Sequence, residues 1–194
     1  MIAQDEGLES QQCKILGLIH RAGRVRGKQV YQPDADLCWG RTKNKYPIEL
    51  KTFKEGKSCS TSSRLNNRKI HDYKSAPWIM SEKHPDRDEF TGRHFYWPKA
   101  AQYAWLDAQT EKIKKGTKSY IGSSESNQIL EYLKQSGWNE DVVKKLSYTL
   151  EIKGHLLADP RISNKTILDN CVLIDVDNPQ EHLFKLLKED KWVK

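Results

Sequence analysis

The segment Tyr46–Phe53 alternates apolar and polar residues, and this alternation limits the fold more strongly than any other feature of the chain. Such alternation is typical of a half-buried β-strand, because successive side chains of a strand point to opposite faces of the sheet. Ile48 and Leu50 would then face the core, whereas Glu49 and Lys51 would share the other face. The predicted strand therefore brings an acid and an ammonium group together.

Two segments upstream, Gln29–Tyr31 and Ala35–Trp39, contain residues that favour strands. Gly40 and the polar residues that follow it predict a turn into the next strand. The sequence therefore predicts a β-hairpin in which Asp34 and Glu49 lie on adjacent strands.

The residues that point most directly to a chemistry are Asp34, Glu49 and Lys51. Two carboxylates supply the hard oxygen ligands that suit Mg²⁺, which keeps several waters and leaves room for a phosphate oxygen. A lysine beside them can orient or deprotonate an attacking water and offset charge as the pentacovalent phosphate forms. Asp36 is a second candidate for a metal-bound acid, because strand geometry places it on the same side as Asp34. This set of residues favours a metal-dependent phosphodiesterase.

Pro33 and Asp34, followed by Glu49-Leu50-Lys51, resemble the signature of the PD-(D/E)xK nuclease superfamily. That superfamily includes type II restriction endonucleases, mismatch-repair nicking enzymes, junction resolvases and phage nucleases. The resemblance implies an α/β fold like that of restriction endonucleases, with a central mixed β-sheet flanked by helices. We expect one such nuclease domain over residues 1–194.

The resemblance also implies a role for each residue. Asp34, Glu49 and the backbone carbonyl of Leu50 would bind Mg²⁺, or Mn²⁺ in its place, and Lys51 would activate the attacking water. Many members carry one more acid on the preceding helix, and Glu9 is the candidate for that position in this chain. The reaction implied is hydrolysis of a DNA phosphodiester bond.

Less specific interpretations of the same residues stay open. Pro33 and Asp34 also fit a turn, and Glu49 with Lys51 also fits a solvated strand face. A rival triplet, Glu151–Lys153, alternates in the same way, but its upstream acids lie in a predicted helix. We interpret the rival triplet as part of a structural strand.

Residues 54–96 form a long basic stretch without clear periodicity, and we expect a loop-like insertion that contacts DNA. Cationic and hydroxyl side chains suit phosphate contacts, while Asn and Arg can bind base edges in the major groove. A mobile polar surface loop is the alternative. The residues expected to contact DNA are Lys54, Lys57, Arg64, Asn66, Asn67, Arg68, Lys69 and Arg93.

Two histidines of this stretch, His84 and His94, lie near Asp86, Asp88 and Glu89 in the sequence. They raise the alternative of a second metal site, or of a nuclease that uses histidine as its base. The sequence shows no clear pattern of residues for such a site, so we favour surface or DNA-contact roles for these histidines.

The remaining pattern predicts helices and strands in one continuous arrangement. Helices are expected at 5–20, 98–114, 127–135, 139–146 and 181–188, and strands at 148–153 and 171–176. A mixture of this kind indicates an α/β fold with a central sheet.

The basic composition of the chain favours a polyanionic partner. The net charge is +7, and the sequence pI is about 9.1. The 4 cysteines show no Cys-x-x-Cys spacing, which disfavours structural zinc and favours a reduced, cytoplasmic protein. No apolar run is long enough to cross a bilayer, and the first residues do not resemble a signal peptide. We therefore expect a cytoplasmic protein that is not embedded in a membrane.

These features together predict a Mg²⁺-dependent endodeoxyribonuclease. We expect a sequence-specific type II restriction endonuclease that cuts double-stranded DNA as a homodimer. A structure-specific nuclease, such as a junction resolvase or a phage nuclease, is one alternative. A non-catalytic DNA-binding module is another, and RNA is an alternative substrate.

Overall fold

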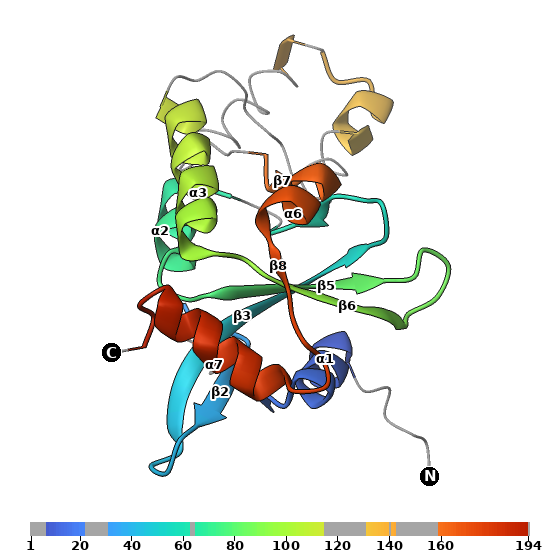
Figure 1. Ribbon diagram of the computed structural model, residues 1–194. Helices are drawn as coiled ribbons and strands as arrows, with labels where there is room; N and C mark the ends of the chain where they lie inside the picture. Colours follow the sequence, from blue (N-terminus) through green and yellow to red (C-terminus); the bar gives the residue numbers. More distant parts are fainter. Residues whose placement is uncertain are drawn as a thin grey trace. The chain divides into compact units, whose positions relative to one another are not determined.

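The computed structural model of the chain describes residues 7–21, 31–62, 65–114, 131–139, 141–142 and 159–193 (Figure 1). The chain divides into two compact units. The first unit comprises Met1–Cys59, Ser75–Gln102 and Ile162–Lys194, and the second comprises Ser60–Lys74 and Tyr103–Arg161. Every residue of the predicted metal site belongs to the first unit.

The first unit contains a six-stranded mixed β-sheet in the order β1-β2-β3-β5-β6-β8. Strands β1 (Ile19–His20), β2 (Ala35–Trp39) and β3 (Asn44–Lys54) are antiparallel neighbours. The predicted hairpin is confirmed, because β2 has the expected bounds and β3 includes the whole of Tyr46–Phe53. Tyr31 lies outside any strand, and residues 29–30 lie outside the described part of the chain.

Strand β3 pairs in parallel with β5 (Trp78–Lys83), and β6 (Phe90–Tyr96) and β8 (Val172–Leu173) continue the sheet in antiparallel order. The α/β class and the mixed sheet are therefore confirmed. The expectation of a loop over residues 54–96 is wrong, because two sheet strands come from this stretch. All residues of β5 are buried, so this strand lacks the alternation by which a half-exposed strand is recognised.

The two faces of the sheet in the first unit have different compositions. On one face an apolar core forms against α1 (Leu8–Leu16) and α7 (Pro179–Glu189). Its members include Cys13, Leu16, Ala35, Leu37, Ile48, Leu50, Ile79, Tyr96, Leu183 and Leu187. The opposite face, which we call the site face, carries Asp34, Glu49 and Lys51.

Strand β3 is a central strand and not the half-buried strand that its alternation predicts. Ile48 and Leu50 are buried in the core, as expected, but Glu49 on the site face is also buried, with 4% of its surface exposed. The alternation thus separates an apolar core face from a polar face on which Glu49 is also shielded from solvent.

Helix α1 is shorter than the helix expected at 5–20. It ends at Gly17, which adopts the left-handed conformation with φ 63° and whose N–H bonds back to the last turn. The residues after Gly17 leave the helix, and Ile19 and His20 form β1 at the edge of the sheet.

The other elements agree in part with expectation. Helix α3 (Lys99–Lys114) matches the helix expected at 98–114, and α7 covers that expected at 181–188. The expected strand at 171–176 is reduced to β8. Most of the helix expected at 139–146 and the strand at 148–153, with the rival triplet, lie outside the described residues.

Four short elements and one helix end complete the description. Helix α2 (Asn67–Tyr73) and α6 (Asn164–Asn170) were not expected, and β4 (Cys59–Ser60) and β7 (Arg161–Ile162) form a separate two-stranded sheet. Gly137, two residues after the helix predicted at 127–135, has φ 78°, in the left-handed region. All 4 cysteines are free thiols. Within the described residues, no helix combines the length and apolar character needed to cross a membrane.

Candidate metal-binding active site

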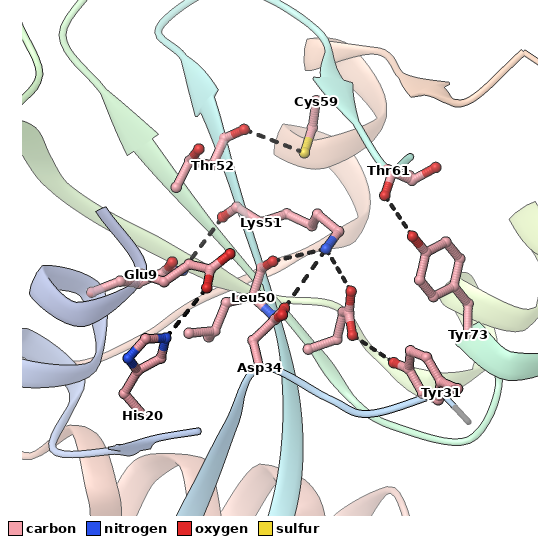
Figure 2. Close-up of polar contacts among 12 residues, drawn as sticks. Glu9, His20, Tyr31, Asp34, Leu50, Lys51, Thr52, Cys59, Thr61 and Tyr73 are labelled. Carbon is pink, nitrogen blue, oxygen red and sulfur yellow. Dashed lines mark hydrogen bonds and ion pairs between the residues drawn. The ribbon is translucent and has the colours of Figure 1, made fainter. Parts of the chain in front are cut away.

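Three oxygen atoms converge on the ammonium group of Lys51 (Figure 2). Lys51 Nζ lies 2.5 Å from Glu49 Oε1, 3.0 Å from the carbonyl oxygen of Leu50 and 3.7 Å from Asp34 Oδ2. These are the oxygens that the sequence predicts as metal ligands. We refer to Asp34, Glu49, Leu50 and Lys51 as the site cluster.

The hairpin register explains why these residues meet. Ala35 of β2 lies opposite Ile48 of β3, so Asp34, one residue earlier, reaches the position beside Glu49. The backbone N–H of Leu50 donates a hydrogen bond of 2.8 Å to Asp34 Oδ2 and fixes this carboxylate. A shift of the register by one residue would turn Glu49 and Lys51 to the core face.

The carboxylate of Glu49 is held on both of its oxygens. Oε1 contacts Lys51, and Oε2 accepts a hydrogen bond of 2.5 Å from the hydroxyl of Tyr31. Burial raises the pKa of the Glu49 carboxyl, an effect that the charge of Asp34 reinforces and that Lys51 and Tyr31 oppose. A cation beside Glu49 therefore stabilises the ionised form of this buried carboxylate.

Lys51 is itself partly enclosed. Its side chain is 18% exposed, and Nζ lies 5.5 Å from the centre of the Trp78 ring, on the neighbouring strand β5. Glu49 is paired with Trp78 in the parallel register, so the aromatic ring and the site cluster share the site face. The ring covers one side of the ammonium group at the distance of a cation–π contact.

The donor set fits a hard divalent cation. Two carboxylates and one main-chain carbonyl already surround a positive charge, and oxygen donors of these types are the ones that Mg²⁺ takes. Among the described residues, no group of three or more His, Cys, Asp or Glu side chains could hold a metal ion. A metal at the site cluster would therefore depend on the Leu50 carbonyl and on water for its remaining ligands.

Glu9 comes from α1 and is engaged by a neighbour. Its Oε2 lies 3.3 Å from Nε2 of His20, and its side chain is 54% exposed. Figure 2 shows the carboxylate of Glu9 directed towards the ring of His20. Burial raises the pKa of the Cys13 thiol to about 11, and the charges of Glu9 and Asp34 add to this effect.

Asp36 follows Asp34 on the site face, as expected, but its carboxylate is bound by Arg21. Arg21 Nε donates to Oδ2 at 2.7 Å and Nη2 donates to Oδ1 at 2.5 Å, in a bidentate pair. The hydrogen bond to Asp36 raises the pKa of Arg21. Both oxygens of Asp36 are thus engaged by Arg21. Its role as a supporting metal-bound acid stays a prediction.

The residues expected to contact DNA differ in their surroundings. Lys54, Lys57, Asn67 and Arg68 are exposed. Asn66 caps α2 by accepting a hydrogen bond from Lys69 N–H, and Arg93 lies 3.5 Å from the buried carboxylate of Glu82. Arg64 lies outside the described residues, and Lys69 Nζ lies over the Tyr73 ring at 5.2 Å.

The alternative histidine site is not assembled in the described part of the chain. His94 is fully buried in β6, where its Nδ1 lies 2.6 Å from Ser81 Oγ. Asp88 pairs with Lys83 at 2.8 Å, and Glu89 pairs with Arg87 at 3.0 Å. Asp88 and Glu89 are therefore engaged by cations, and His94 is buried in the sheet.

Two residues near the site cluster were not predicted to act there. The sequence predicts a strand at Tyr31, whereas Tyr31 reaches Glu49 from an irregular segment. Gln12 of α1 donates from Nε2 to the carbonyl of Lys51 at 3.3 Å and to Ser81 Oγ at 2.6 Å. The only sequence signal for Gln12 is a polar residue four positions before Leu16, on the buried side of the helix.

No model of a known protein family matches this chain, and no curated protein gives a significant match.

Proposed function

We propose that this protein is a Mg²⁺-dependent endodeoxyribonuclease of the PD-(D/E)xK type, with the restriction-endonuclease-like arrangement of its sheet. The observation that supports the proposal most strongly is the convergence of Asp34, Glu49 and the Leu50 carbonyl on the ammonium of Lys51. Oxygen ligands and a lysine on one strand face are what phosphodiester hydrolysis by a metal-dependent enzyme requires.

Asp34, Glu49 and the Leu50 carbonyl would hold the metal. A bound Mg²⁺, or Mn²⁺ in its place, supplies Lewis-acid chemistry at the scissile phosphate. Tyr31 holds the carboxylate of Glu49 in one orientation, and the Leu50 N–H does the same for Asp34. These supporting hydrogen bonds keep the ligands in place before the substrate arrives.

Lys51 would take part in hydrolysis through its Nζ. Once it moves away from the ligand oxygens, the ammonium can donate hydrogen bonds to the attacking water or to a phosphate oxygen. Its charge offsets the negative charge that develops as the pentacovalent phosphate forms. The nearby Trp78 ring excludes water from one side of this group.

The partner proposed is double-stranded DNA. The net charge of +7 favours a polyanion, and the exposed residues Lys54, Lys57, Asn67 and Arg68 can bind phosphates or base edges. Sequence-specific cleavage by a homodimer, as in type II restriction endonucleases, is the form of activity that we propose. Cytoplasmic location is part of the same proposal.

One observation favours a second candidate function. The charges of Asp34 and Glu49 are already offset by Lys51, so the site cluster is also complete as a structural ion cluster. A protein with such a cluster and a basic surface would be a non-catalytic DNA-binding module. This candidate predicts DNA binding that is indifferent to divalent metal.

The deciding experiment is a cleavage assay with matched variants. Purified protein is incubated with plasmid DNA, phage DNA, a four-way junction and RNA, with Mg²⁺ or with EDTA. Glu49→Gln and Lys51→Met test the site, and Glu55→Gln and Lys185→Met are controls at exposed positions, with folding of each variant checked by circular dichroism.

Discrete DNA fragments that need Mg²⁺, vanish in both site variants and persist in both controls would support the sequence-specific nuclease. Cutting of the junction alone would support a structure-specific nuclease, and cutting of RNA alone would change the substrate class. Intact nucleic acid under every condition, with DNA binding retained, would overturn the nuclease proposal in favour of the binding module.

A further inference from the structure

The turn that joins β2 and β3, together with the start of β3, carries three exposed cations, Arg41, Lys43 and Lys45. Within the described residues, none of these three side chains takes part in an ion pair or a side-chain hydrogen bond. Figure 1 shows that this hairpin extends past α1 and α7. We refer to the three cations as the hairpin tip.

The hairpin tip has a defined backbone conformation. Lys43 N–H donates to the carbonyl of Gly40 at 3.1 Å, and the thiol of Cys38 contacts the carbonyl of Lys43 at 3.5 Å. Gly40 has φ 84° and Lys43 has φ 48°. A lysine in the left-handed region costs about 1 kcal/mol relative to glycine. A long cationic side chain therefore occupies a position where the backbone favours Gly or Asn.

The register of β3 aligns the hairpin tip with the site cluster. Lys45, Glu49 and Lys51 lie at alternate positions of one strand, so their side chains leave the same face of the sheet. The rise of a strand places Lys45 about 13 Å from Glu49. Phosphates of one DNA strand follow one another at about 3.4 Å along the helix axis, so this distance corresponds to about four base pairs.

We propose that the hairpin tip is a contact surface for the phosphate backbone of double-stranded DNA, about four base pairs from the phosphate at the site cluster. The position of this contact rests on the proposed function, whereas the contact itself does not require cleavage. Acidic proteins would also be attracted to three cations, but alignment with a site for phosphodiesters favours DNA. The hairpin tip would fix the direction in which the duplex crosses β3.

The test is the salt dependence of DNA affinity in EDTA, measured by fluorescence anisotropy with a labelled duplex. One variant carries Arg41→Gln, Lys43→Gln and Lys45→Gln. The matched control carries Lys185→Gln, Lys188→Gln and Lys191→Gln, which removes the same charge from exposed positions in and after α7. Loss of three phosphate contacts would reduce the slope of log affinity against log salt by about 2.7, and the control would keep a slope near the wild-type value.

Cleavage with Mg²⁺, measured in parallel, separates the two proposals. Wild-type cleavage together with an unchanged slope in the hairpin-tip variant would overturn the contact and leave the nuclease intact. A reduced slope in that variant alone, without any wild-type cleavage, would support the contact while the nuclease proposal fails. Equal reductions in both triple variants would mean that net charge alone acts, and the hairpin-tip contact would be rejected.

Discussion

The hydroxyl of Tyr31 donates a hydrogen bond of 2.5 Å to Glu49 Oε2, while the other oxygen of this carboxylate faces Lys51. The buried carboxylate is therefore fixed in one orientation by a residue that lies upstream of both hairpin strands. A ligand that is oriented in advance loses little freedom when a cation binds.

Replacing Tyr31 with Phe is expected to weaken metal binding at least about tenfold, because partners that orient metal ligands typically contribute 10- to 100-fold. The hydrogen bond from Tyr31 lowers the pKa of Glu49, so its removal should also shift the acid limb of metal binding to higher pH. Calorimetric titration with Mn²⁺ at several pH values measures both effects. Tyr46→Phe, on the core face of β3, should change neither effect. An unchanged Mn²⁺ affinity of Tyr31→Phe would contradict the proposed orienting role.

Replacing Lys51 with Met is expected to separate the two candidate functions. The change leaves Asp34 and Glu49 without their cation, so the free energy of unfolding without metal should fall by about 1–3 kcal/mol. Mg²⁺ should then raise the melting temperature of the variant more than that of the wild type, because the metal replaces the lost charge. Thermal unfolding with and without Mg²⁺ tests this, with Lys185→Met as the control. A variant that is destabilised but does not respond to Mg²⁺ would support a purely structural ion cluster.

Asp36→Asn is expected to lower stability without affecting the metal. Its bidentate partner Arg21 would lose an ionic acceptor, and loss of this partly buried pair should cost about 1–3 kcal/mol in unfolding free energy. Urea unfolding measures the loss, and Mn²⁺ titration of the same variant should give the wild-type affinity. A drop in affinity comparable to that of Asp34→Asn would instead make Asp36 a metal ligand.

The buried His94 predicts a loss of stability in acid. Burial lowers the pKa of His94 from 6.5 to about 4, so the unfolded chain binds a proton that the folded protein excludes between these pH values. The contribution of His94 to the free energy of unfolding is fully present above pH 6.5. It falls by about 2–3 kcal/mol as the pH drops towards 4. His94→Gln should reduce this pH dependence in urea unfolding. His71→Gln, at an exposed position, should leave it unchanged, and a His94→Gln profile identical to the wild-type profile would contradict the assignment.

The hairpin and its acids could be predicted because their signals are local. Alternation in Tyr46–Phe53 and a turn at Gly40 set the register, and the register alone brings Asp34 beside Glu49. The contacts around them could not be predicted in this way. Gln12 and Ser81 are 69 residues apart in the sequence. The hydrogen bond between them gives the Ser81 hydroxyl a partner in β5, a strand that is buried throughout.

The bidentate pair of Asp36 and Arg21 shows the same limit. Strand geometry predicts which face Asp36 occupies, but it does not predict that an arginine before the hairpin closes on it. Residue types and spacing identify groups that can act together. Which partner each group takes depends on segments that are distant in sequence.

The packing of β3 has a consequence for the order of events during protein synthesis. Its core face is covered partly by Leu183 and Leu187 of α7, and its parallel neighbour β5 is translated only after the hairpin. Contacts between distant segments form late, because the chain between them must first be made and closed. A nascent chain that has just passed Lys51 therefore carries all the side chains of the site cluster without the packing that aligns them. The site cluster is aligned only when the downstream helix has left the ribosome and docked.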